Sequence, residues 1–108
     1  WGIFRLGRLL LPKRLSSVPL AAALGGFVSV PAAALAFVGL YAVGGAAPIP
    51  LGSLAATMGA WHVVIGLGEA LITALVVGSL VSTRPDLVAG ARDLVEADEL
   101  EIRAVVAA

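Results

Sequence analysis

Residues 58–80, MGAWHVVIGLGEALITALVVGSL, decide the fold of this chain. A helix needs about 20 consecutive apolar residues to cross the hydrocarbon core of a bilayer, and this stretch supplies them. It also carries the only histidine, His62, and an isolated carboxylate, Glu69. On a helix these two side chains share one face, about 10 Å apart along the axis. Because ionisable groups inside a membrane span are costly and usually functional, this face is the first candidate site.

The composition is that of a membrane protein. Of the 108 residues, 60% are hydrophobic and only 13% are charged, and no Lys, Arg, Asp or Glu occurs between Arg14 and Glu69. No surface of a small water-soluble domain sustains such a gap. The charges are segregated, with basic residues near the N-terminus at Arg5, Arg8, Lys13 and Arg14, and acidic residues near the C-terminus at Asp93, Glu96, Asp98, Glu99 and Glu101. The short basic cluster has no interleaved stacking aromatics, so we expect no nucleic-acid partner.

We predict an all-α fold, a two-span helical hairpin that forms part of a larger polytopic membrane protein. The spans are expected at 18–43 and 51–82, joined by the breaker-rich turn 44–50, GGAAPIP. Pro31, inside the first span, predicts a bend at 27–31 because it removes one helical hydrogen bond. Residues 1–16 form a basic juxtamembrane segment that contacts membrane lipid, and 17–83 form the hairpin.

Residues 84–108 are predicted to lie outside the membrane. The stripe of apolar positions within 85–95 predicts a short amphipathic helix, and the acidic run after Glu96 predicts a solvated tail. Lys and Arg precede the first span and Arg84 follows the second, whereas the connector has no charge. The positive-inside rule therefore places both chain ends in the cytoplasm, in a multi-pass protein of the cell (inner) membrane.

Two faces of the spans carry patterns of small or polar residues. In the first span, three- and four-residue spacing predicts a helix-packing face of Gly25, Ser29, Ala32, Ala36 and Gly39. In the second, the polar intramembrane motif is His62, Gly66, Gly68, Glu69 and Thr73. The motif is typical of either a helix interface held by polar contacts or the wall of a pocket.

The motif carries a family resemblance. The run HVVIGLGEALIT from His62 to Thr73, followed by Arg84-Pro85-Asp86-Leu87, resembles the H-x-x-I-G-x-G-E-A-L-I-T stretch of CbiM/NikM-type permeases. These are the substrate-binding membrane subunits of energy-coupling-factor ABC importers for cobalt or nickel. The resemblance covers roughly 51–88, the C-terminal part of such a permease, and the first span agrees only in character.

The resemblance implies partners and a transported ion. Separate ATPase and transmembrane coupling subunits are expected, since the chain has no phosphate-binding Gly-Lys-Ser/Thr loop. Such permeases bind the metal largely through an N-terminal Met-His segment and a further histidine, which Trp1-Gly2 and the rest of this chain do not match. We therefore expect a fragment that lacks the permease's N-terminal half and binds no cofactor. The metal ligands stay unknown, and His62 is a minor candidate.

Other functions compete with this interpretation. Glu69 is expected to bond to a helix outside the chain, because carboxylates inside membranes are rarely unpaired. A structural or assembly hairpin would pack other transmembrane helices without handling substrate, and would tolerate replacement of His62. An intramembrane enzyme using His62 and Glu69 as acid and base ranks last, because no nucleophile accompanies them.

Overall fold

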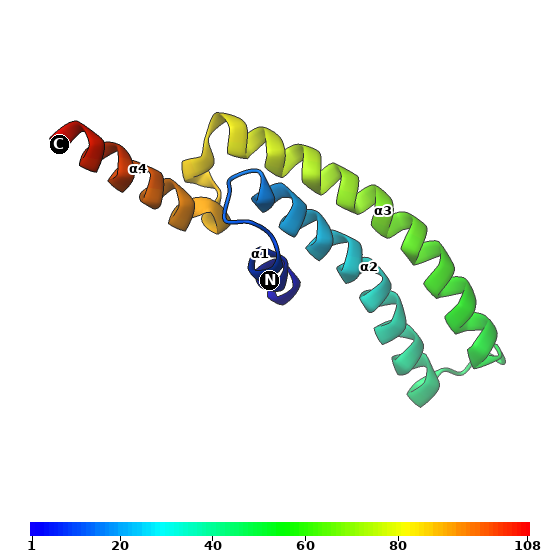
Figure 1. Cartoon of the computed structure of the whole chain (residues 1–108). Helices are drawn as coiled ribbons and strands as arrows, with labels where there is room; N and C mark the ends of the chain where they lie inside the picture. Colours follow the sequence, from blue (N-terminus) through cyan, green and yellow to red (C-terminus); the bar gives the residue numbers. More distant parts are fainter.

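Two long antiparallel helices form the body of the computed structural model, which describes residues 1–108. Figure 1 shows α2 (Ser17–Gly44) and α3 (Leu51–Thr83) side by side along a common arc, with α1 (Gly2–Leu10) across the start of α2. Two 3-10 turns, η1 (Pro85–Leu87) and η2 (Ala89–Ala91), lead into α4 (Arg92–Ala107). The predicted all-α hairpin is confirmed, and α2 and α3 lie within about one residue of the predicted spans.

Both long helices are suited to a membrane. Each is long and apolar enough to cross a bilayer. Most of their large side chains are exposed, including Leu40, Trp61 and Leu75 at 65% or more. Large apolar surfaces of this kind are rare on monomeric soluble proteins, so lipid or further helices cover them.

A tyrosine fastens the end of the hairpin where α2 turns into α3. The Tyr41 hydroxyl donates a hydrogen bond to the carbonyl oxygen of Ala47, and the Ile49 N–H donates to the Tyr41 oxygen at 3.1 Å. Residues 45–50 contain glycine and prolines that cannot continue a helix. One side chain of α2 thus replaces the missing helical hydrogen bonds of the connector.

A small apolar cluster closes the opposite end. Val18 of α2, Val81 of α3 and Ala91 of η2 are buried together. Gly7 lets α1 approach α2 closely, since a Cβ added there would lie 3.3 Å from both the Cα and the Cβ of Ala21. An ion pair between Arg8 and Asp93, with 2.8 Å between nitrogen and oxygen, joins α1 to α4. All elements outside the hairpin therefore gather at one end of it (Figure 1).

The predicted C-terminal helix is present, but its predicted bounds of 85–95 were wrong. The chain forms η1 and η2 there, and the amphipathic helix begins only at Arg92. Pro85 has no N–H for a helical hydrogen bond, and Gly90 favours helix poorly. A Cβ at Gly90 would also lie 2.8 Å from a ring carbon of Phe4, so glycine is required for the ring to pack there.

The residues beyond Glu96 are exposed, as expected of a solvated tail, but they are helical, because α4 continues to Ala107. Its sequence is rich in strong helix formers. Glu99 precedes Arg103 by four residues, the favourable order for a helical ion pair, and Asp93 lies in the first turn, where the helix dipole favours negative charge.

An exposed ion pair fixes the turn that follows α3. Arg84 Nε and Nη2 donate to the two Asp86 oxygens at 2.9 and 2.8 Å. These hydrogen bonds, more than the charge attraction itself, hold the pKa of Asp86 below its usual range and raise the pKa of Arg84. Both residues belong to the Arg84-Pro85-Asp86-Leu87 motif, which therefore acts locally to direct the chain away from α3.

Candidate functional site

A close contact between α2 and α3 involves a proline, a carbonyl and a glycine. Pro31 lies inside α2 without interrupting it. It has no N–H, so the carbonyl oxygen of Phe27, four residues earlier, loses its helical donor. Buried Gly66 of α3 lies directly against this oxygen, and an added Cβ would be only 2.9 Å from it. The lack of a side chain at Gly66 lets α3 pack against this part of α2.

A second glycine, Gly26 of α2, lies against polar residues of α3. A Cβ at Gly26 would lie 3.2 Å from Thr73 Oγ1, 3.5 Å from Glu69 Cγ and 3.7 Å from the Glu69 carbonyl oxygen. Gly66, Glu69 and Thr73 therefore line the same contact with α2. His62 lies one turn before Gly66 on this side of α3. We name His62, Gly66, Glu69 and Thr73 the polar seam.

The orientation of His62 follows from one hydrogen bond. Its Nδ1 lies 2.7 Å from the carbonyl oxygen of Met58, one turn earlier in α3. A carbonyl only accepts, so Nδ1 carries the hydrogen and donates it. In the neutral imidazole this leaves Nε2 with the lone pair, as the atom that accepts a hydrogen bond or binds a metal.

Glu69 reaches the edge of the α2–α3 contact and is exposed. Neither carboxylate oxygen has a hydrogen bond or an ion pair within the chain. A carboxylate at membrane depth is costly unless it is paired, protonated or in contact with water. Within the chain, the polar seam therefore contains an unpaired carboxylate.

The remaining predicted residues lie elsewhere. Gly68 points away from the polar seam and has no atom near an added Cβ. The packing face predicted for α2 does not meet α3, because Ser29, Ala32, Ala36 and Gly39 are exposed and Gly25 lies beside α1. Buried Ala34 and Val38 lie on the α3 side instead. Packing of the predicted face on a helix outside the chain stays a prediction.

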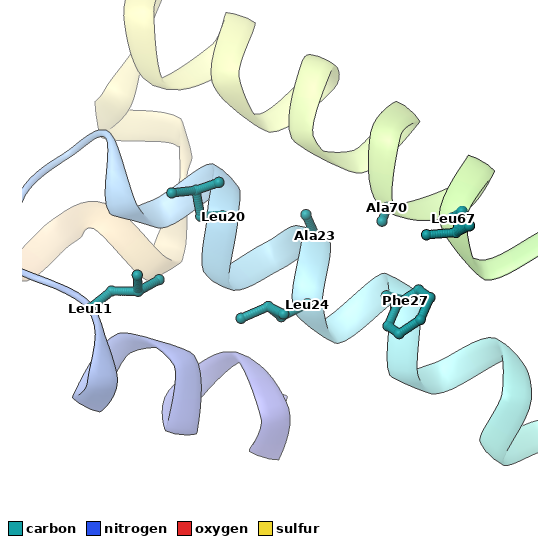
Figure 2. Close-up of a pocket in the computed structure, with 7 residues that line it drawn as sticks. All are labelled: Leu11, Leu20, Ala23, Leu24, Phe27, Leu67 and Ala70. Carbon is teal, nitrogen blue, oxygen red and sulfur yellow. The ribbon is translucent and has the colours of Figure 1, made fainter. Parts of the chain in front are cut away.

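An apolar groove opens beside the polar seam, between the end of α1, α2 and α3 (Figure 2). Its volume is about 360 Å³. All of the lining side chains are hydrophobic: Leu11, Leu20, Ala23, Leu24, Phe27, Leu67 and Ala70. Phe27 belongs to both features, since its carbonyl meets Gly66 and its ring lines the groove.

The chain does not assemble a metal site by itself. No three His, Cys, Asp or Glu side chains converge anywhere in it. His62 and Glu69 are separated by about 10 Å along α3, too far to hold one ion together without other ligands.

Comparison with known protein families decides what the hairpin belongs to. Residues 1–87 match the family described as CbiM, cobalt uptake substrate-specific transmembrane region. The chain belongs to the CbiM family. It is a component of a transporter and not an enzyme, which excludes acid–base catalysis by His62 and Glu69. No curated protein and no solved structure matches the chain significantly.

The match is wider than the motif resemblance. It includes α1, α2 and α3 from the first residue, whereas the sequence motif pointed to 51–88 alone. It ends at Leu87, so α4 lies outside the region shared with the CbiM family.

The contact at Gly66 is testable by comparison with Gly68, which lies in the same helix. We expect Gly66→Ala to lower the free energy of unfolding by about 1 to 3 kcal/mol relative to Gly68→Ala, since its methyl group overpacks against the Phe27 carbonyl. The intrinsic helix propensity gained is the same in both variants and cancels. Unfolding by sodium dodecyl sulfate in mixed micelles, followed by circular dichroism, measures the difference. Equal stability of the two variants would contradict close packing at Gly66.

Proposed function

We propose that this CbiM-family chain is part of the membrane substrate-binding permease of an energy-coupling-factor importer for cobalt or nickel ions. The family match over residues 1–87 carries the proposal, because it includes both membrane helices and the polar seam. Import against a gradient needs an energy source, which a separate ATPase and a transmembrane coupling subunit provide.

The ion's primary ligands lie outside this chain, in the N-terminal half of the permease. His62 and Glu69 support them from the polar seam. His62 presents Nε2 for a hydrogen bond or for coordination, since its Nδ1–H is held by Met58. Glu69 accepts a hydrogen bond from a helix that is not part of this chain. Two observations support this arrangement, the unpartnered carboxylate and the exposed small-residue face of α2.

The orientation in the cell membrane follows from the charges. Every Lys and Arg lies in α1, in the loop after it, or beyond α3, at the end where α1 and α4 gather (Figure 1). The connector at the other end is uncharged. By the positive-inside rule, both chain ends are cytoplasmic.

Single cysteines test the orientation, because the chain has none of its own. In intact cells, Ala47→Cys in the connector is expected to react with a membrane-impermeant maleimide, and Arg5→Cys in α1 is expected to react only after the membrane is permeabilised. The opposite pattern would reverse the orientation and leave the hairpin itself intact.

Metal binding by the purified chain tests the position of the ligands. We expect no binding of Co²⁺ or Ni²⁺ at micromolar affinity, because one imidazole and a distant carboxylate offer too few converging ligands. Isothermal titration calorimetry in detergent measures this. Micromolar or tighter binding that His62→Ala abolishes would place a primary ligand within this chain.

Substitutions of Glu69 in the full permease separate hydrogen bonding from charge. Glu69→Ala is expected to impair uptake more than Glu69→Gln does. The amide keeps the volume and most of the hydrogen-bonding capacity, whereas alanine leaves a buried partner unsatisfied at about 1 to 3 kcal/mol. Uptake of radioactive cobalt or nickel, at matched amounts of protein in the membrane, measures both.

The other outcomes are also informative. Equal and nearly complete loss of uptake in both variants would show that Glu69 acts through its charge, as a ligand or a proton carrier. Normal uptake by both, together with normal uptake by His62→Ala, would favour the assembly hairpin that handles no substrate.

A further inference from the structure

We propose that an anionic phospholipid binds specifically at the junction of α1, α2 and α3. One of its acyl chains occupies the apolar groove, and its phosphate lies against Lys13 and Arg14 in the α1–α2 loop. The location in the cytoplasmic leaflet rests on the proposed orientation, whereas the binding itself does not.

The groove has the chemistry and the direction that an acyl chain requires. Its lining is hydrophobic throughout and it opens to the outside of the hairpin (Figure 2). It begins at Leu11 and Leu20, at the level of the α1–α2 loop, and continues to Phe27. Leu20 and Phe27 are about 10 Å apart along the axis of α2. The groove therefore extends from the membrane interface into the hydrocarbon region.

Positive charge lies at the loop end of the groove. Lys13 follows Leu11 by two residues, so their Cα atoms are at most about 7 Å apart. Lys13 and Arg14 are exposed and form no ion pair within the chain. They line a hollow of about 220 Å³ together with Leu15, Leu94 and Asp98.

The charges in this hollow favour a phosphate. Two cations and the single carboxylate of Asp98 leave a net charge of about +1, which one phosphodiester neutralises. Anionic headgroups bind to basic pockets between membrane helices on the cytoplasmic side, where such lipids are concentrated. One phospholipid has both chemistries. Its charged headgroup matches Lys13 and Arg14, and its apolar acyl chain matches the groove that starts at Leu11.

The dimensions favour a lipid over a helix of another subunit. A helix with its side chains is about 10 to 12 Å across. The groove holds about 360 Å³ between Leu11, α2 and α3, and the α1–α2 loop lies at its interfacial end. Part of one acyl chain fits this space, whereas the groove admits only one or two side chains of a neighbouring helix.

Native mass spectrometry tests the proposal on the protein taken from bilayers with equal amounts of phosphatidylglycerol and phosphatidylcholine that share the same acyl chains. We expect phosphatidylglycerol to be retained preferentially. Lys13→Gln and Arg14→Gln are each expected to lower its affinity about fivefold, equivalent to about 1 kcal/mol. Arg103→Gln, which removes an exposed cation from α4, is the matched control and is expected to leave retention unchanged.

A groove-filling variant tests the acyl chain separately. Ala23→Phe is expected to lower retention of both lipids, with circular dichroism confirming that the helices are intact.

Equal retention of the two lipids, or equal effects of Lys13→Gln and Arg103→Gln, would overturn the phosphate site, whether or not Ala23→Phe folds. Loss of lipid on reassembly with the transporter's other subunits would show that a protein segment takes the groove in the complex, and would also overturn the proposal. None of these measurements depends on metal uptake, so they fail or succeed independently of the proposed function.

Discussion

The contact between Gly66 and the carbonyl of Phe27 determines how α2 and α3 fit together. Lipid tails are as apolar as the side chains of a membrane helix, so the hydrophobic effect does not drive two such helices together. They associate through close packing and polar contacts instead. Pro31 frees a backbone acceptor in the middle of α2, and a glycine at position 66 is small enough to cover it. With that register set, Gly26 receives Glu69 and Thr73. The polar seam therefore lies where the two helices pack closely at Gly66 and Gly26.

Much of the fold was predictable because membrane spans are constrained by length and composition alone. The limits of α2 and α3 follow from apolar runs bounded by prolines, glycines and charges. The packing side of α2 was harder to predict, because the helix is apolar all around and has no polar face to mark the side away from α3. Small residues gave the only periodic signal, and it identified Gly25 rather than its neighbour Gly26. In the C-terminal region, the prediction of a helix at 85–95 relied on the apolar stripe. The structure has 3-10 turns up to Ala91, because Pro85 and Gly90 disfavour an α-helix.

The candidate site was predictable to a similar degree. Of the predicted motif, Gly66, Glu69 and Thr73 lie against α2 whereas Gly68 does not, and the resemblance of the motif pointed to the family that the chain belongs to. The role of Phe27 was missed, because a side-chain pattern does not show backbone carbonyls. A signal existed nevertheless, since a proline inside a span identifies an unpaired carbonyl four residues earlier. The sequence identifies no partner for the Glu69 carboxylate, and no residue of this chain forms a hydrogen bond or an ion pair with it.

The hairpin is fastened at three levels, by Tyr41 at the connector, by Gly66 in the middle and by Val18 with Val81 at the opposite end. Changing the angle between α2 and α3 would break at least one of these contacts. A transporter that alternates between two open states has to move some parts against others. The contacts at Tyr41, Gly66 and Val18 oppose any such movement between α2 and α3.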